Sequence, residues 1–237
     1  MSFLWTKQFR KPVTNIFEWG SLSFYDSNNN EITTDSFPQP PKITLFDEKG
    51  NTINSYESEF PEQCLSNNYI DPESTVLELG ARYGSVSCVI NKKLTNKKNQ
   101  VSVEPDSTVW SALEQNISRN NCSVQIYKGF VSKKSRGLLP YGYAATSYVD
   151  NNSIIPSASV EDLERQYDLT FDTVVADCEG FLEEFFDEHT QLYDQLNTVI
   201  FEADYPNKCN YTKIRTTLKE HGFQQVIHGF QNVYKKL

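Results

Sequence analysis

The sequence has no apolar run long enough to cross a membrane, which would need about 20 residues. Its first residues, MSFLWTKQFRKP, lack the apolar stretch of a secretory signal. The five cysteines are widely spaced and include no CxxC pair, which indicates neither a disulfide framework nor a zinc site. We therefore expect a soluble, cytoplasmic protein without a membrane partner.

Basic residues are in the minority. The chain has 22 Lys and Arg against 31 Asp and Glu, which gives a formal net charge of -9. A surface that binds the phosphate backbone of nucleic acids is usually positive, so we do not expect a nucleic-acid partner. With 237 residues, 38% of them hydrophobic, the chain can form one main domain and a small appendage.

Residues 1–60 predict a β-rich N-terminal extension. Aromatic residues between 17 and 24 precede the turn-forming run SNNNE at 27–31, and a second such run, DEKGN at 47–51, lies between apolar and β-branched segments. This alternation of strand-forming and turn-forming residues is typical of β-hairpins. We predict two hairpins there, followed by the main domain over residues 61–237.

From residue 75 onward, short apolar runs alternate with amphipathic stretches, which is the pattern of an α/β fold. The apolar runs predict strands at 75–79, 100–104, 123–127, 171–176 and 198–202. Helices are predicted at 61–69, 85–93, 108–119, 160–167, 181–196 and 211–221, and a closing antiparallel hairpin at 223–236. Ser159 and Asp162 resemble a capping box that opens the helix at 160. The long segment 132–157 stands apart, because its glycines and prolines are expected to interrupt any element.

The run VLELGARYG at 76–84 predicts a strand that enters a glycine turn and then a helix. Gly80 allows a ligand to approach the backbone, Gly84 allows a tight helix entry, and the helix start presents free N–H groups. Glu78 adds an acceptor for a ligand with hydroxyl groups or positive charge. The spacing is not that of the GxGxxG dinucleotide fingerprint, and such a turn can also be purely structural.

Glu104 follows the next predicted strand. A carboxylate there can accept hydrogen bonds from two neighbouring ribose hydroxyls, as in dinucleotide enzymes. Alternatively, Glu104 or Asp106 complements the dipole of the helix that follows. Together with Glu78 and Gly80, Glu104 favours a nucleoside ligand without a pyrophosphate. S-adenosylmethionine fits this pattern better than NAD.

Two later predicted strands each end in a pair of carboxylates, Asp177 with Glu179 and then Glu202 with Asp204. If these strands are neighbours, the carboxylates converge where an open α/β sheet binds its ligand. Such a group is unfavourable unless it binds a metal, accepts donors from a substrate or holds a proton on one member. The alternative for a single member is a cap on a loop or a helix start.

These segments resemble the FkbM family of class I S-adenosylmethionine-dependent methyltransferases. The residues that carry the resemblance are VLELGARYGSVS at 76–87, SVEPD at 102–106, VADCEGFLEEFF at 175–186 and IFEADYP at 200–206. The resemblance implies a Rossmann-like sheet of seven strands flanked by helices, with the last strand antiparallel. It also implies in-line transfer of the methyl group of S-adenosylmethionine to a hydroxyl group of a sugar, a glycan or another small molecule.

The resemblance also implies the roles of single residues. It implies that the segment 177–179 faces the methyl group and the acceptor, and from the chemistry of an alcohol acceptor we hypothesise that Asp177 or Glu179 acts as the catalytic base or as a metal ligand. A divalent cation, Mg²⁺ or Mn²⁺, would take Asp177, Glu202 and Asp204 as hard oxygen ligands. The cofactor would contact Glu78, Gly80, Ala81, Gly84, Ser85, Glu104, Pro105, Phe130, Val131 and Asp177.

The segment 132–157 also carries Tyr141, Tyr143 and Tyr148, which are candidates for a lid over a sugar acceptor or for loop anchors. The N-terminal hairpins are candidates for pairing two subunits into a homodimer or for walling the acceptor pocket. Two other classes stay open. One is a non-catalytic binding module on a methyltransferase fold. The other is an RNA ribose 2′-O-methyltransferase, which would need a basic groove and a catalytic lysine among the acids.

Overall fold

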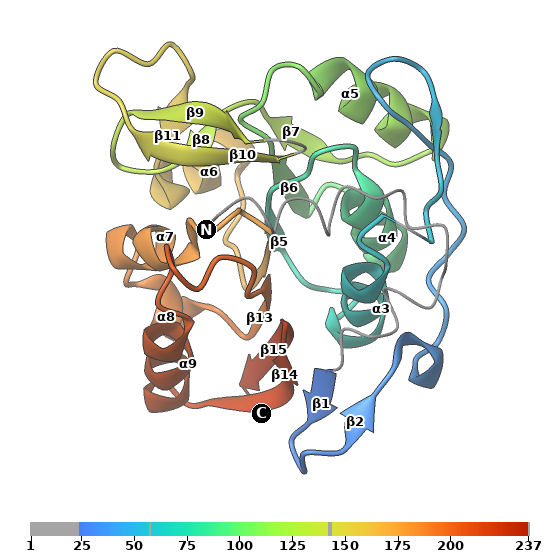
Figure 1. Cartoon of the computed structure of the whole chain (residues 1–237), viewed down its shortest axis with the longest axis vertical. Coiled ribbons are helices and arrows are strands. Elements are labelled where there is room, and N and C mark those ends of the chain that lie inside the picture. The colour runs from blue at the N-terminus through green and yellow to red at the C-terminus, as the bar shows by residue number, and fades with distance from the viewer. Residues whose placement is uncertain (1–23, 57, 142–143, 237) are drawn as a thin grey trace.

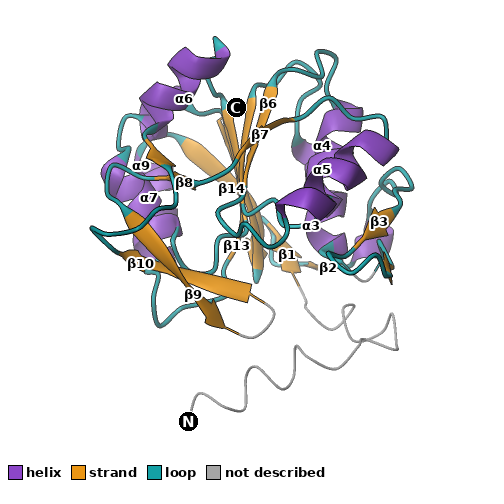
Figure 2. Ribbon diagram, turned by 90° about the horizontal axis from the view of Figure 1, so that it is seen from above, coloured by secondary structure: helices purple, strands orange, loops and turns teal. Residues whose placement is uncertain are grey.

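The computed structural model describes residues 24–56, 58–141 and 144–236. Within these ranges, nine strands form one central sheet. Helices cover both faces of this sheet (Figure 1 and Figure 2). In spatial order the strands are β2 (Glu31–Ile32), β1 (Phe24–Asp26), β14 (Phe223–Gly229), β15 (Gln231–Lys236), β13 (Thr198–Glu202), β12 (Thr173–Ala176), β5 (Val76–Leu79), β6 (Gln100–Val103) and β7 (Gln125–Tyr127).

The strands in the middle of the sheet run parallel. β12 pairs in parallel with both β13 and β5, and β6 and β7 continue in the same direction. β15 runs antiparallel to its two neighbours, β13 and β14. Every residue of β5, β6 and β12 is buried, as expected of strands covered on both faces. The architecture is an α/β, Rossmann-like fold with a mostly parallel sheet.

Helices cover the two faces of this sheet. Figure 2 shows α3, α4 and α5 on one side and α6, α7 and α9 on the other. Among the described residues, no helix combines the length and apolarity needed to cross a membrane. The bounds are α3 (Phe60–Tyr69), α4 (Ser85–Lys93), α5 (Trp110–Arg119), α6 (Val160–Tyr167), α7 (Leu182–Glu188), α8 (Leu192–Gln195) and α9 (Tyr211–Glu220), with a short 3₁₀ helix η1 at Thr34–Ser36.

The N-terminal segment adds to the central sheet. Phe24 of β1 is the register partner of Gly229 in β14, and β2 pairs with β1. In the described residues the sheet therefore has two strands more than the expected seven, because an edge strand such as β14 can accept a further partner. Residues 17–23 of the first predicted hairpin lie outside the described residues.

The second N-terminal hairpin consists of β3 (Leu45–Phe46) and β4 (Thr52–Ile53). Two buried asparagines of the α5 region hold it in place. Asn116 accepts from the N–H of Phe46 (3.0 Å) and donates to its carbonyl (2.9 Å), and Asn120 does the same for Thr44 (3.0 and 2.9 Å). Each side-chain amide thus takes the place of a strand partner for the hairpin.

The predicted helix over 181–196 is in fact two helices, α7 and α8. His189 lies between them and is fully buried. The N–H of Val160 donates to its Nε2 (3.3 Å), and its Nδ1 lies 2.9 Å from the carbonyl oxygen of Phe185. These contacts hold the break between the two helices, and the apolar residues of both helices are buried.

The expectation that residues 132–157 form no element is wrong. β9 (Arg136–Tyr141) and β10 (Ala144–Val149) pair as an antiparallel hairpin, with Pro140 opposite Ala145. A two-stranded hairpin consists of edges only, where proline is tolerated. The short strands β8 (Phe130–Val131) and β11 (Ser157–Ala158) pair in parallel on either side of it in the sequence. The predicted capping box of Ser159 and Asp162 at the start of α6 is confirmed.

Candidate functional site

Three neighbouring parallel strands bring the predicted site together. β5, β12 and β13 lie side by side, so their carboxyl ends meet at one edge of the sheet. The glycine turn at 80–84 follows β5, Asp177 follows β12 directly, and Glu202 is the last residue of β13. This is the edge where open α/β sheets bind their ligands.

The glycine turn packs directly on the loop after β12. Gly80 has φ +92°, and a Cβ atom there would lie 1.7 Å from the carbonyl oxygen of Asp177. Gly84 has φ +81°, and its Cβ would lie 3.0 Å from the Leu113 side chain. Both glycines are therefore required by backbone geometry and packing, whether or not a ligand is present. Ala81, between them, is buried.

Glu104 stands at the end of β6 with both carboxylate oxygens engaged. Oε2 accepts from the backbone N–H of Arg82 (2.7 Å), and Oε1 accepts from that of Asp106 (2.7 Å). Burial raises the pKa of Glu104 to about 7, against these hydrogen bonds and the Arg82 charge. Each oxygen keeps a second lone pair, so the carboxylate can accept donors from a ligand. Pro105 follows it and is half-buried.

Glu78 is bonded within the protein. Its Oε2 accepts a close hydrogen bond from the Ser102 hydroxyl and a longer one from Gln100 Nε2 (3.4 Å), both on β6. Burial raises the pKa of Glu78 to about 7. The predicted cofactor contact of Glu78 thus corresponds to a buried carboxyl with partners on the neighbouring strand.

Asp177, Glu179 and Asp204 form a compact group, called the carboxylate cluster below. One carboxylate oxygen from each lies within 4.8 Å of the others. Asp204 Oδ1 accepts from the Tyr211 hydroxyl (2.8 Å) and from the backbone N–H of Tyr205 (2.9 Å). The predicted convergence of these acids is therefore what the tertiary structure produces.

All three acids of the carboxylate cluster have a raised pKa. Burial, followed by the charge of Glu202, holds the pKa of Asp177 well above its usual range. Burial and the Asp204 charge raise the pKa of Glu179 to about 8. Burial also raises the pKa of Asp204, although the Tyr211 hydroxyl opposes this. Three acids this close together favour a shared proton or a bound cation.

Glu202, predicted as a metal ligand, is not one of these three residues. Its Oε2 accepts from Gln231 Nε2 (2.7 Å), its register partner on β15. Burial and the Asp204 charge hold the pKa of Glu202 well above its usual range. Glu179, which lies in the loop after β12 and has a positive φ of 53°, is in the group in its place.

Sequence reasoning missed two further acids, Glu59 and Glu62, at the start of α3. Glu62 is 2% exposed, and burial together with the Glu59 and Glu78 charges holds its pKa well above the usual range. Glu59 accepts a close hydrogen bond from the hydroxyl of Ser85, a predicted cofactor contact. Helix α3 packs against β13 and β15, which brings Glu62 near Asp204. The signal available in the sequence was an acidic residue, Glu62, inside the helix predicted at 61–69.

The remaining predicted contacts lie further along the chain. Phe130 and Val131 are buried in β8, and Val131 belongs to the main core. Tyr148 is 40% exposed, lies over Gly137 and donates to Asp150 Oδ2 (3.3 Å). Tyr141 is the last residue of β9, and Tyr143 lies outside the described residues.

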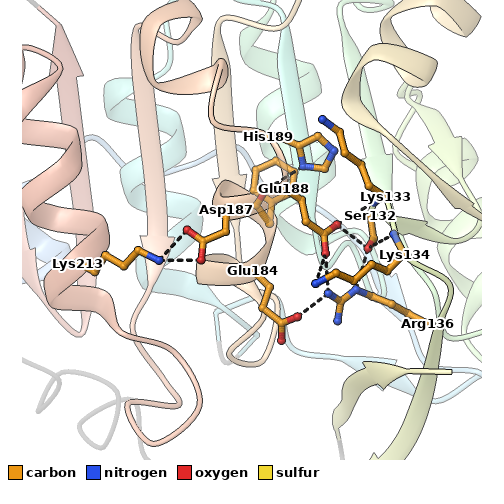
Figure 3. A network of polar contacts seen from close by, with 10 residues as sticks. Ser132, Lys133, Lys134, Arg136, Glu184, Asp187, Glu188, His189 and Lys213 are labelled. Atoms are coloured by element: carbon orange, nitrogen blue, oxygen red, sulfur yellow. Dashed lines mark hydrogen bonds and ion pairs between the residues drawn. The ribbon is translucent and has the colours of Figure 1, made fainter.

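A buried arginine connects the β9–β10 hairpin to helix α7, which follows the loop of the site. Figure 3 shows Arg136, which is fully buried, with its Nη2 donating to Glu184 (2.6 Å) and Glu188 (2.9 Å) of α7. Its Nε donates to the Ser132 hydroxyl (2.8 Å), and the guanidinium lies 4.2 Å from the centre of the Phe181 ring. The base of the hairpin is therefore fixed next to the loop that carries Asp177 and Glu179.

No protein-family model matches the chain, and no curated protein sequence matches it. Its structure is similar to solved structures of methyltransferases. A precorrin-6y C5,15-methyltransferase from Geobacter metallireducens GS-15 has a TM-score of 0.48 and 15% identity, with 85% of this chain and 96% of that chain covered. A ribosomal protein L11 methylase from Lactobacillus delbrueckii subsp. bulgaricus has a TM-score of 0.47 and 18% identity, with 83% of each chain covered.

An O-methyltransferase from Bacillus cereus in complex with SAH has a TM-score of 0.42 and 12% identity, with 78% of this chain and 82% of that chain covered. At these TM-scores and identities the likenesses assign no activity to this chain. An assignment has to rest on the residues of the site.

Proposed function

We propose that the protein is an S-adenosylmethionine-dependent O-methyltransferase of the FkbM family. It would act on a hydroxyl group of a sugar, a glycan or another small molecule. The observation that carries this proposal is the carboxylate cluster at the same sheet edge as the 80–84 turn and Glu104. The glycine turn and Glu104 would bind one nucleoside cofactor, and the carboxylate cluster would bind one polar molecule that receives the methyl group.

The residues present fit such a cofactor. Glu104 can accept the two ribose hydroxyls while its backbone-bonded oxygens stay in place. The start of α4, directly after Gly84, presents N–H groups without intrahelical acceptors. When bound, S-adenosylmethionine supplies an electrophilic methyl group.

The carboxylate cluster would handle the proton of the acceptor hydroxyl. An alcohol is a weak nucleophile, so a base must take its proton during methyl transfer. A carboxyl whose pKa lies near 8, as for Glu179, is a stronger base when ionised than an ordinary one. Asp177, two residues earlier in the chain and in the same cluster, is the second candidate.

The same donor set fits a divalent cation. Carboxylate oxygens are the ligands that Mg²⁺ and Mn²⁺ prefer, and Asp177, Glu179 and Asp204 place one oxygen each within 4.8 Å of the others. Glu202, close enough to raise the pKa of Asp177, would lie beside this set. The hairpin, with Tyr141 and Tyr148, is proposed as the lid over the sugar acceptor.

Calorimetric titration with S-adenosylmethionine and S-adenosylhomocysteine tests the proposal. We expect wild type to bind both, Glu104→Ala to lose binding at least about tenfold, and the exposed control Glu220→Ala to bind like wild type. Absence of binding in wild type, with and without Mg²⁺, would refute a methyltransferase and favour a non-catalytic module.

A further inference from the structure

A pocket of about 670 Å³ lies beside the carboxylate cluster, and the proposed function above does not assign it. Its walls are the loop after β13 at residues 206–210, the first turn of α9 and the turn at Gly229–Phe230 between β14 and β15. The volume is in the range of small-molecule sites. Ala203, another lining residue, donates its N–H to the carbonyl of Phe230 (2.8 Å), which links the loop after β13 to this turn.

The pocket and the carboxylate cluster share a wall. Tyr211 lines the pocket, and its hydroxyl donates to Asp204 Oδ1 (2.8 Å). Lys208, another lining residue, packs so closely that a Cβ atom on Gly180 would lie 3.1 Å from its Cβ. Gly180 directly follows Glu179. Residues that line the pocket therefore contact both Asp204 and the loop that carries Glu179.

The charged groups of the pocket favour an anion. Arg215 is half-buried and is held by two bonds, from Nε to Asn232 Oδ1 (3.1 Å) and from Nη2 to the Gly229 carbonyl (3.2 Å). A guanidinium has five N–H donors, and the described residues provide acceptors for two of them here. Lys208 adds a second cation, with its ammonium 5.2 Å from the centre of the Tyr205 ring.

The acid in the pocket wall has partners of its own. Glu183 accepts from the backbone N–H of Asn210 (2.8 Å) and from Lys213 Nζ (3.2 Å), which also bonds Asp187 (2.7 Å). Among the lining residues, the cations Lys208 and Arg215 outnumber the acid Glu183, in a protein whose net charge is -9. This is the reverse of the carboxylate cluster next to it.

Helix α9, which has ten residues, begins at the pocket. Asn210 caps it by accepting from the N–H of Lys213 (3.0 Å). The N–H of Thr212 lies in the first turn and has no intrahelical acceptor. This helix start therefore adds a donor and a partial positive charge on the same side as Arg215 and Lys208.

The other lining groups suit a carbohydrate. Phe230 is partly exposed and offers an aromatic face, and Asn207 and Thr212 offer hydrogen-bonding side chains. We propose that this pocket binds the anionic group of a phosphorylated or carboxylated sugar, and that Arg215 is its main anchor. Its role as part of the methyl acceptor's site rests on the proposed function, whereas anion binding itself does not.

Titrations of ¹⁵N-labelled protein with inorganic phosphate, glucose 6-phosphate, glucuronate and glucose test the proposal. We expect phosphate and glucose 6-phosphate to shift the amide signals of residues 207–212, 229 and 230. Arg215→Gln should weaken glucose 6-phosphate binding by about tenfold, and the exposed Lys208→Gln by about threefold. Lys219→Gln, an exposed change at the far end of α9, should bind like wild type.

Wild-type shifts that are absent or scattered over the surface would overturn the proposal. So would unchanged affinity in both Arg215→Gln and Lys208→Gln. Lys208→Gln keeps the test valid if Arg215→Gln does not fold. Tighter binding of glucuronate than of glucose 6-phosphate would identify a carboxylate as the anion. Calorimetry with S-adenosylmethionine on the same samples distinguishes the two proposals. If wild type does not bind S-adenosylmethionine but still shows the expected phosphate shifts, methyl transfer is refuted and the anion site is not.

Discussion

Glu104 and Asp204 are both nearly buried acids close to the ends of parallel strands, with 5% and 7% exposure, but their surroundings differ. Glu104 receives a backbone N–H on each oxygen and has Arg82 nearby. Asp204 Oδ1 accepts from the Tyr205 N–H and from the Tyr211 hydroxyl, and Asp204 lies among other acids. The Glu104 carboxylate is thus surrounded by hydrogen-bond donors, whereas the carboxylate cluster needs a proton or a cation to relieve repulsion.

The largest effect should come from the residue that joins the two sites. Gly80→Ala places a Cβ 1.7 Å from the carbonyl oxygen of Asp177. We expect a loss of about 3 kcal/mol or more in the free energy of unfolding, because β5 and the loop after β12 must move apart. Urea denaturation measures it. Gly50→Ala is the matched control, since Gly50 also has positive φ (82°) but no atom within 4 Å of the added Cβ. It should cost only about 1 kcal/mol.

Glu78→Gln tests whether buried acids destabilise the fold when they ionise. The folded-state pKa is raised from 4.5 to about 7, so wild type has its full stability below pH 4.5 and loses part of it as the pH rises through 7. We expect the variant to gain up to about 3 kcal/mol relative to wild type between pH 4.5 and pH 8. Urea denaturation at these pH values measures it. Stability curves that stay parallel for the two proteins would contradict this.

A divalent cation should bind at the carboxylate cluster and not at Glu104. Mn²⁺ at 100 times its dissociation constant should stabilise wild type by about 2.7 kcal/mol against thermal unfolding. Asp204→Asn should abolish this gain, because it removes a charged member of the carboxylate cluster. Glu104→Gln should keep it. An equal response in all three proteins would mean that the metal binds elsewhere.

Glu104 should make cofactor binding depend on pH. Its pKa is about 7, and ribose hydroxyls donate better to the ionised form. The affinity for S-adenosylmethionine should therefore rise about tenfold from pH 6 to pH 8 and then level off. Calorimetry at several pH values measures it. Glu104→Gln should bind more weakly and without this slope, and a slope that survives in the variant would assign it to another group.

The smallest effect concerns the hydroxyl between the carboxylate cluster and the pocket. Tyr211→Phe removes the donor to Asp204 Oδ1, and we expect a loss of about 1 kcal/mol in the free energy of unfolding. Tyr148→Phe is the control, since this hydroxyl is on an exposed side chain and bonds only Asp150 among the described residues. Equal urea midpoints for the two variants would show that the Tyr211 bond contributes nothing.

Much of the fold was predictable from local pattern. The helix at 85–93 and the strand at 198–202 have the predicted bounds, because apolar spacing and the flanking turns define them locally. The capping box at Ser159 was equally readable. The break at His189 was not, since it depends on a hydrogen bond from Val160, 29 residues earlier. The β9–β10 hairpin was missed because proline and glycine are breakers inside a sheet but not in an isolated pair of edges.

The candidate site divides in the same way. The chain order alone put Asp177 and Glu179 after one strand and Glu202 and Asp204 at the next, because polar residues that follow buried apolar runs mark strand ends. Which of them share one space is a matter of side-chain direction, so Glu179 joined the carboxylate cluster and Glu202 paired with Gln231.

The sequence by itself determined the alternation of strands and helices and the placement of carboxylates and glycines at strand ends, since these follow from local periodicity. Only the tertiary structure decided that Glu62 lies near Asp204, that the Tyr211 hydroxyl donates a hydrogen bond to Asp204, and that Arg215 lines the adjoining pocket. The approach of Glu62 to Asp204 joins segments far apart in the chain, whereas Tyr211 reaches Asp204 across the loop between β13 and α9. These contacts form because helices α3 and α9 pack on a sheet whose strand order differs from the order of the sequence.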